Sequence, residues 1–293
     1  MAERVVLVTG ATDGVGKLVA ARFAAEGARV LLHGRDAAKG AAVLAELTAA
    51  SGNDRLELYR ADFASLEEVR WMADEIASRH HRLDVLINNA GIGAAHGATL
   101  ARSGPVKRAG APEPHAPESL AKSRDGYELR LAVNHLAAYL LTRSLEPLLA
   151  ASEAPRVVQV SSIGQSPIDF DDVMLTQGQD EMHAYRQSKF AQVMFAFELA
   201  ERWRGVGLTA VAVHPASFMA TKMVLEAGIA PKSTPEEGAA AIWRAATAPE
   251  LAGGSELFFN GVEAARARDE QAYDRQARTR FWDLSADLTG LPR

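Results

Sequence analysis

The strongest constraint on the fold is an alternation of short strand-like segments with stretches of helical periodicity. Residues 5–8 form an unbroken apolar run, and similar segments recur at 29–32, 56–59 and 84–87. Unalternating apolar runs are typical of parallel strands buried on both faces of a sheet. Helical patterns that end near residues 27, 50 and 79 separate the four segments. The pattern therefore predicts an α/β fold, with a doubly wound parallel sheet and helices on both faces.

The alternation of strand-like and helical segments stops after the fourth strand-like segment and resumes about 30 residues later. Residues 94–123 show neither helical nor strand periodicity and contain four prolines, so we expect an insertion loop there. Beyond it the sequence predicts helices at 125–149, 182–203 and 234–247, and strands at 156–160, 208–213 and 256–259. A charged tail, 264–293, is expected to be helical. Residues 1–293 are thus predicted to form one domain with about seven strands.

Composition removes several function classes. The chain has 293 residues, a formal net charge of −5 and no cysteine. The acidic balance argues against a nucleic-acid partner, and the missing cysteines exclude disulfides, thiolate metal sites and a cysteine nucleophile. His96 and His115 lack the spacing of metal ligands, so no metal is expected. The sequence shows neither a membrane span nor a signal peptide, which predicts a cytoplasmic protein.

A glycine-rich turn follows the first predicted strand and opens the first helix. Gly10, Gly14 and Gly16 lie in the segment TGATDGVG, which begins at Thr9. Glycines at such a turn let the backbone approach a pyrophosphate, and the following helix offers free N–H groups and a positive dipole end. This context predicts a dinucleotide-binding Rossmann fold, although a generic strand-to-helix turn is the simpler alternative.

The end of the second strand bears on the choice of cofactor. An acidic side chain there would bind the ribose hydroxyls of NAD, whereas a basic one would pair with the 2′-phosphate of NADP. The sequence has no acid at the strand end and places Arg35 just beyond it. We therefore expect NADP(H), with NAD(H) as the alternative; Asp13 and Asp36 nearby argue mildly against a phosphate.

An acid–base pair is predicted on the long helix 182–203. Tyr185 and Lys189 are four residues apart, so both side chains project from one helix face. A neighbouring ammonium group favours the phenolate form and would lower the tyrosine pKa toward neutrality. Paired serines, Ser161 and Ser162, end the fifth strand, and a polar Asn134 interrupts an apolar helical segment. Each feature alone has an ordinary structural explanation, but their order along the chain favours a catalytic site.

Together these motifs resemble the short-chain dehydrogenase/reductase family from Thr9 to about Thr221. The resemblance implies a catalytic tetrad of Asn134, Ser162, Tyr185 and Lys189. Tyr185 would donate a proton to the carbonyl oxygen, Ser162 would hydrogen-bond that oxygen, and Lys189 would hold the nicotinamide ribose. Asn134 would anchor a water molecule. The hydride would come from the nicotinamide.

The resemblance also implies a set of cofactor contacts, which includes Tyr185 and Lys189 of the tetrad. They are Gly10, Thr12, Gly14, Val15, Gly16, Arg35, Asp62, Phe63, Asn89, Ala90, Gly91, Tyr185, Lys189, Pro215 and Thr221. Two departures from the family pattern concern the stretch after the sixth strand. Ala216 replaces the usual glycine after Pro215, and Thr221 comes one residue late. The contacts of Pro215 and Thr221 are therefore less firmly predicted, and residues 222–231 are expected to form a substrate loop.

The interval between Ser162 and Tyr185 is longer than is usual in the family. Such an extension resembles the retinol-dehydrogenase-like and carbonyl-reductase-like branches and antibiotic-pathway ketoreductases. With the loop 94–123 as a lid, it suggests a covered pocket for a larger carbonyl substrate. The predicted function is NADP(H)-dependent reduction of a ketone or aldehyde, or the reverse oxidation.

Other functions and assembly states stay open. The same fold could serve an epimerase or dehydratase, but the glycine spacing and the absence of a larger C-terminal domain argue against this. A non-catalytic NADP-sensing regulator would typically lack Tyr185 or Lys189. The family often pairs subunits through its two long helices, so a homodimer or homotetramer is expected, with a monomer as the alternative.

Overall fold

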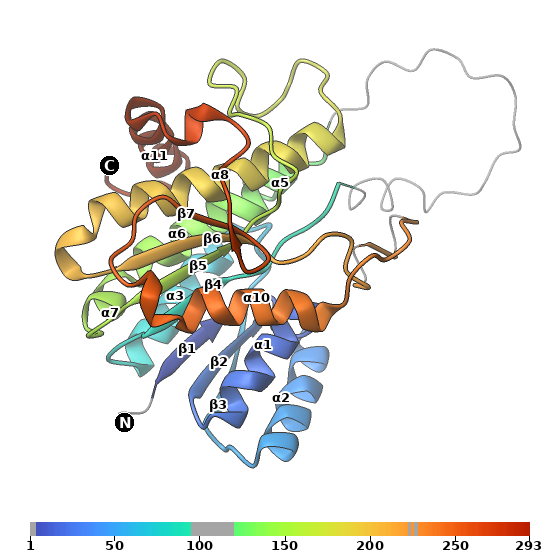
Figure 1. The fold of residues 1–293 in the computed structure, drawn as a ribbon, viewed down its shortest axis with the longest axis vertical. Coiled ribbons are helices and arrows are strands. Elements are labelled where there is room, and N and C mark those ends of the chain that lie inside the picture. The colour runs from blue at the N-terminus through green and yellow to red at the C-terminus, as the bar shows by residue number, and fades with distance from the viewer. Residues whose placement is uncertain (1–3, 95–119, 222–223, 226–227) are drawn as a thin grey trace, which may run out of the picture.

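The fold is built around one twisted sheet (Figure 1). The computed structural model describes residues 4–94, 120–221, 224–225 and 228–293. Within these ranges the strand order is β3-β2-β1-β4-β5-β6-β7-β8, and all pairings are parallel except β7 with β8. The strands are β1 (Val5–Val8), β2 (Arg29–Gly34), β3 (Leu56–Arg60), β4 (Val85–Asn88), β5 (Arg156–Val160), β6 (Thr209–His214), β7 (Leu257–Asn260) and β8 (Glu263–Ala264). The predicted doubly wound sheet is confirmed.

The short eighth strand was not foreseen. Both residues of β8 are exposed, and the strand only folds back antiparallel on the end of β7. Two exposed residues carry no apolar pattern, so periodicity could not identify them.

Helices cover both faces of the sheet. One layer contains α1 (Gly14–Ala25), α2 (Ala37–Ser51) and α10 (Pro235–Thr247), and the other contains α3 (Leu66–Arg79), α6 (Ala137–Ser144) and α8 (Glu181–Arg202). Side chains alternate between the layers: Val6 and Val8 of β1 pack with the first, and Leu7 with the second. Strands buried on both sides explain the apolar runs of the sequence.

The expected helix at 125–149 is divided into shorter pieces. They are α5 (Leu129–Leu131), the π-helical turn η1 (Ala132–Leu136), α6 and α7 (Glu146–Ala150). Gly126 has φ of +85°, which no α-helix allows, so the helix begins after it. Pro147 lacks a backbone N–H and lies in the first turn of α7, where helices tolerate proline.

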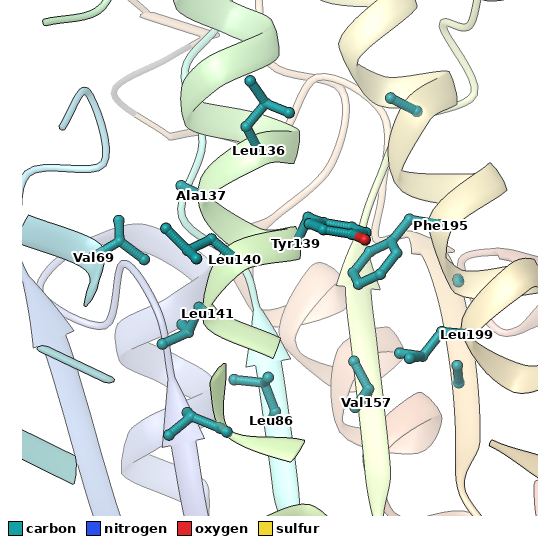
Figure 2. Packing of buried hydrophobic residues seen from close by; sticks show 14 of the residues in the cluster. Val69, Leu86, Leu136, Ala137, Tyr139, Leu140, Leu141, Val157, Phe195 and Leu199 are labelled. Atoms are coloured by element: carbon teal, nitrogen blue, oxygen red, sulfur yellow. The ribbon is translucent and has the colours of Figure 1, made fainter. Parts of the chain in front are cut away.

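The tail forms α11 (Arg275–Thr289), which packs across α6 and α8. Figure 2 shows Tyr139 of α6 beside Phe195 of α8, with ring centroids 5.2 Å apart. Trp282 of α11 contacts both rings, at 5.1 Å and 5.8 Å. A buried ion pair of 3.5 Å between Arg278 and Glu198 joins α11 to α8. The C-terminal helix therefore covers part of the two helices expected to pair subunits.

A buried histidine in η1 makes stability sensitive to acid. His135 bonds Ser285 Oγ at 2.8 Å and stacks on Phe281, and burial lowers its pKa to about 3. The folded state thus excludes a proton that the unfolded chain binds below about pH 6.5. We expect this residue to cost stability as the pH falls, by about 1.4 kcal/mol per unit between pH 6.5 and 3.

Urea unfolding of the wild type and His135→Phe across pH 4.5–7.5 measures this contribution. The stability difference between the two proteins should move in favour of the variant by about 2 kcal/mol on going from pH 6.5 to 4.5. A difference that stays constant with pH would show that His135 is not the titrating group.

Candidate functional site

The carboxyl ends of four adjacent strands bring the predicted residues to one edge of the sheet. The glycine loop follows β1, Asn89 to Gly91 follow β4, Ser162 follows β5 and Pro215 follows β6. In open parallel sheets this edge is where ligands bind, at the point where strand order reverses. Here the order reverses between β1 and β4, so the glycine loop and residues 89–91 lie on either side of that point.

The glycine loop is packed too tightly for side chains at two positions. A Cβ on Gly16 would lie 2.3 Å from Asn89 Nδ2 and 2.4 Å from Gly10 O. Gly10 has φ of +64°, and a Cβ there would lie 3.0 Å from Ala90 Cα. The backbone therefore passes close to the β4 loop, and neither Gly10 nor Gly16 could carry a side chain without a shift of its neighbours. This cradle fits a pyrophosphate held by helix N–H groups.

Thr9 and Asn89 fix the shape of this cradle. Thr9 Oγ1 accepts hydrogen bonds from the N–H groups of Asn89 and Ala90, each at 2.9 Å. The Asn89 amide nitrogen in turn donates to Thr9 O at 2.8 Å. The side chain of Asn89 therefore links the β4 loop to the end of β1, and this link fixes the shape of the predicted cofactor site.

His33 supports the same loop, and its role was missed from the sequence. Its Nδ1 accepts from the N–H of Gly10 at 3.1 Å, so its Nε2 donates to Ala61 O at 3.0 Å. The ring stacks on Phe63, with centroids 4.3 Å apart. Burial lowers the pKa of His33 to about 4, which keeps the imidazole neutral and able to accept. A histidine inside a buried strand was the signal that could have identified it.

The region after β2 contains the charged residues that bear on cofactor choice. Arg35 is exposed and forms no ion pair with another described residue. Asp36 caps α2 by accepting from the Lys39 N–H at 3.0 Å, and Asp13 caps α1 and pairs with the Lys39 ammonium. Both acids are thus engaged with helix ends, which weakens the objection that they would repel a phosphate at Arg35.

At the predicted adenine end, Asp62 is held in a defined position. Its Oδ1 accepts from Ala64 N at 3.1 Å, and its Oδ2 lies 3.3 Å from Arg124 Nη2. Phe63 is buried against His33. Phe63 thus lies against the histidine that supports the glycine loop, and a role of Asp62 and Phe63 at the adenine stays a prediction.

Tyr185 lies in the first turns of α8, opposite the end of β5. The Ser162 hydroxyl, which accepts from Gly164 N at 3.0 Å, lies close enough to the Tyr185 phenol to influence its pKa. Burial raises the tyrosine pKa, and the Ser162 hydroxyl acts in the opposite direction. The neighbouring Ser161 donates to Lys189 O at 2.6 Å. The structure therefore directs Ser162, and not Ser161, at Tyr185.

Lys189 lies one turn further along α8, with its ammonium 5.9 Å from the centroid of the Tyr185 ring. The ammonium donates to Val160 O and to Gln192 Oε1, both at 3.0 Å. Burial lowers the pKa of Lys189 to about 8. A Cβ on Gly91 would lie 3.4 Å from this nitrogen, so the glycine lets the ammonium lie against the β4 loop. Gln192 was not singled out from the sequence.

Asn134 joins the β4 loop to α8. Its Oδ1 accepts from Ile92 N at 2.8 Å, and its Nδ2 donates to Ile92 O at 3.1 Å and to Ser188 Oγ at 2.9 Å. It lies in the π-helical turn η1, an irregularity often found at functional sites. Asn134, Ser162, Tyr185 and Lys189 therefore converge on one end of the sheet.

The segment after β6 reaches back toward the glycine loop. A Cβ on Gly14 would lie 3.7 Å from the Thr221 methyl group, so Thr221 lies over the start of α1. His214 bonds Ser217 Oγ at 3.0 Å beside Pro215. Burial, with a smaller effect of the Lys189 charge, lowers its pKa to about 4. Part of the expected substrate loop 222–231 lies outside the described residues.

Comparison with known proteins places this arrangement in a family. A sequence profile described as short chain dehydrogenase matches residues 4–230. The chain belongs to the short-chain dehydrogenase family. Human retinol dehydrogenase 13 is 32% identical over 306 residues, covering 98% of this chain and 85% of that protein. Human retinol dehydrogenase 11 is 32% identical over 301 residues, with coverage of 99% and 86%.

Solved structures agree with this assignment. A putative uncharacterized protein from Mycobacterium paratuberculosis superimposes with a TM-score of 0.75 at 29% identity, covering 99% of this chain and 94% of that one. The Pseudomonas aeruginosa RhlG/NADP active-site complex superimposes with a TM-score of 0.65 at 26% identity, with coverage of 89% and 95%. This short-chain dehydrogenase is therefore a retinol-dehydrogenase-like oxidoreductase, and its family binds NAD(P).

The extended interval before Tyr185 is ordered against the rest of this short-chain dehydrogenase. Gln165 donates to Ser162 O at 2.6 Å and accepts from Arg268 N at 2.9 Å. Gln271 exchanges two hydrogen bonds with the backbone of Ile168, and Gln187 of α8 bonds Asp169 and Val173. The extension is thus fixed by the C-terminal segment and by α8. Residues 95–119, most of the predicted lid with His96 and His115, lie outside the described residues.

Two general features of this short-chain dehydrogenase concern metals and membranes. Over the described ranges, no three His, Asp or Glu side chains cluster as metal ligands. In the same part of the chain, no helix combines the length and the apolar character needed to cross a membrane.

Proposed function

We propose that this oxidoreductase interconverts a carbonyl compound and an alcohol with NADP(H), using Tyr185 as the proton donor in the direction of reduction. The observation that carries the proposal is the contact between the Tyr185 phenol and the Ser162 hydroxyl, with the Lys189 ammonium alongside. These groups lie at the same sheet edge as the glycine cradle. The two hydroxyl groups that would bind the carbonyl oxygen therefore lie at the same edge of the sheet as the loop that would bind the dinucleotide.

Each residue of the site has a separate role in the proposed reduction. Ser162 and Tyr185 hydrogen-bond the substrate oxygen, which places that atom next to the phenolic proton. Tyr185 releases this proton as negative charge develops on the oxygen. The bound nicotinamide supplies the hydride. In the direction of oxidation the tyrosine accepts the alcohol proton instead.

Lys189 and Asn134 support the tyrosine. The ammonium has three N–H donors, of which two are directed to Val160 O and Gln192 Oε1. The third would bind the nicotinamide ribose, and the positive charge would stabilise the phenolate that forms after proton transfer. Asn134 holds the β4 loop at Ile92 against α8, which keeps this geometry in place.

The cofactor proposal rests on Arg35, which is exposed at the end of β2 and free of ion pairs within the described ranges. The RhlG/NADP complex shows that a similar chain binds NADP. We expect Arg35→Ala to raise the KM for NADPH by about 10- to 100-fold through loss of a charge-assisted bond to the 2′-phosphate. The KM for NADH should change little, and initial rates with both cofactors measure this.

Arg55→Ala is the matched control for the cofactor test. Arg55 bonds the Asn53 side chain and Gly27 O at the opposite end of β2, where β3 begins. Its loss should leave the ratio of the two KM values unchanged. An Arg35→Ala enzyme that kept the wild-type preference would remove Arg35 from cofactor selection.

The substrate proposal is a larger, apolar aldehyde, ketone or alcohol. Ile163 follows Ser162, Met182 lies one turn before Tyr185, and both side chains are exposed at about 40%. Phe218 and Leu225 are exposed in the segment after β6. Water-exposed apolar side chains around a polar centre favour ligands that bury them. The similarity to retinol dehydrogenases supports the same class.

NADPH oxidation against aldehydes and ketones of increasing chain length tests the reaction and the substrate class together. We expect kcat/KM to rise with the apolar surface of the substrate. Equal rates with short polar carbonyls would contradict the apolar class, and absence of NADPH oxidation with every carbonyl would contradict the reaction. The cytoplasmic location and the homodimer or homotetramer stay predictions.

A further inference from the structure

Lys189 is held from the interior of the protein by a glutamine one turn further along α8. Its ammonium donates to Gln192 Oε1 at 3.0 Å. Because an ammonium group can only donate, this contact requires the amide oxygen to face the lysine and turns the amide nitrogen away from it. Gln192 is 1% exposed, so neither end of its amide reaches solvent.

The amide nitrogen of Gln192 belongs to a set of buried polar atoms without a hydrogen-bond partner among the described residues. The set also contains Asn88 Oδ1 and both amide atoms of Gln159. Asn88 and Gln159 are register partners on β4 and β5, and Asn88 Nδ2 donates to Thr142 Oγ1 of α6 at 3.0 Å.

Gln159 lies on the same side of the sheet as Lys189. Side chains alternate along a strand, so Gln159 projects from the face that carries Val157, which Figure 2 shows near α6 and α8. Gln159 also directly precedes Val160, whose carbonyl accepts the second hydrogen bond of the Lys189 ammonium. The amides of Asn88, Gln159 and Gln192 therefore occupy the layer between the sheet and the helices that cover this face.

Buried amides rarely stay unpaired, because an unmade hydrogen bond in the interior is costly. A buried water molecule typically makes about three hydrogen bonds to such groups. We propose that Gln192 is a positioning residue that keeps the Lys189 ammonium charged and in place, and that water bound by Asn88, Gln159 and Gln192 fixes the orientation of its amide.

This inference rests on the proposed function, in which the charge of Lys189 supports Tyr185. The titratable groups of the described residues that face the ammonium are Tyr185 on the same helix and His214 on β6. Burial raises the pKa of Tyr185 and lowers that of His214 to about 4, so neither carries a charge at pH 7. The described hydrogen bonds that stabilise the ammonium therefore come from neutral oxygens, those of Val160 and Gln192.

The pH dependence of unfolding tests the inference without any substrate or cofactor. Free energies of unfolding are measured from pH 6.5 to 10 for the wild type, Gln192→Leu and Gln192→Glu, each with and without Lys189→Met. The difference within each pair reports the titration of Lys189. Its midpoint should fall by about one pH unit or more in Gln192→Leu, which lacks the acceptor, and rise by a similar amount in Gln192→Glu, which adds a negative charge.

The alkaline limb of the pH profile of kcat/KM should move in the same two directions. Gln187→Leu is the matched control, because Gln187 is an equally buried glutamine of α8 whose amide binds Asp169 and Val173 instead. It should leave the titration midpoint of Lys189 unchanged. Shifts of opposite sign in the two Gln192 variants are not expected from a loss of packing alone.

The outcomes separate this inference from the proposed function. Unchanged midpoints in both Gln192 variants would overturn the positioning role, even in an enzyme that needs Tyr185. If the midpoints move as expected while Tyr185→Phe keeps its NADPH oxidation, the proposed function fails and the role of Gln192 stands. Gln159→Leu tests whether bound water orients the Gln192 amide. A titration midpoint of Lys189 that falls, as in Gln192→Leu, would support the bound water, and an unchanged midpoint would overturn it.

Discussion

Replacing Tyr185 with phenylalanine should reduce kcat for NADPH-dependent carbonyl reduction by about 10²- to 10⁴-fold, the usual contribution of a positioned general acid. The variant removes one oxygen atom from a half-buried side chain and leaves the ring near Lys189. The Ser162 hydroxyl keeps its contact with Gly164 N. Stopped-flow or steady-state absorbance at the NADPH band measures the effect.

The fold and the cofactor site of Tyr185→Phe should stay intact. The loss of activity must therefore appear in kcat and not in the affinity for NADPH. Tyr127→Phe is the matched control, because the Tyr127 hydroxyl donates to Leu288 O of α11 and does not touch the site. That variant should keep wild-type rates. Wild-type turnover in Tyr185→Phe would remove the tyrosine from the chemistry.

Much of the fold was predictable because its determinants are local. The apolar runs of β1, β2, β4 and β5 follow directly from burial on both faces, and the glycines mark the tight turn after β1. The spacing of Tyr185 and Lys189 predicts their shared helix face without any tertiary information. Ser162 could be distinguished from Ser161 only by family resemblance, and the hydrogen bonds of both serines now give a geometric reason.

The unpredicted features depend on contacts between distant segments. His33 accepts from the glycine loop and donates to Ala61, and nothing in its own strand indicates either partner. Asn89 was expected at the cofactor, yet its amide nitrogen is committed to the backbone of Thr9, because the loops after β1 and β4 meet only once the sheet has formed. Gln192 resembles any polar residue of a long helix until the fold brings its amide to the Lys189 ammonium.

The packing of the C-terminal helix was equally inaccessible to pattern analysis. The sequence indicated a helical tail at 264–293, of which residues 275–289 form α11. Its position across α6 and α8 depends on Trp282 meeting Tyr139 and Phe195, residues more than 80 positions away. The chain itself therefore covers Tyr139 of α6 and Phe195 of α8, two residues of the helices expected to pair subunits.

Replacing Lys189 with methionine should have two large effects, one on rate and one on stability. Loss of the charge that we propose holds the ribose and stabilises the phenolate should lower kcat/KM by about 10²-fold or more. Methionine has similar length and flexibility, so the buried volume is retained. The wild type and the variant are compared by NADPH oxidation and by urea unfolding, and turnover close to that of the wild type would contradict the catalytic role.

The stability effect follows from the depressed pKa of Lys189, about 8 in the folded state against 10.5 for the ordinary group. Between pH 8 and 10 the unfolded chain binds a proton that the folded protein has released, so this group makes the wild type more stable as the pH rises. The slope approaches about 1.4 kcal/mol per pH unit, and the wild type should gain about 2 kcal/mol over Lys189→Met across this range. Below pH 8 both states of the wild type are protonated at this group, so the stability difference should level off. A difference that is flat from pH 7 to 10 would mean that the buried ammonium keeps its ordinary pKa, and that the site stabilises its charge more strongly than the contacts with Val160 and Gln192 account for.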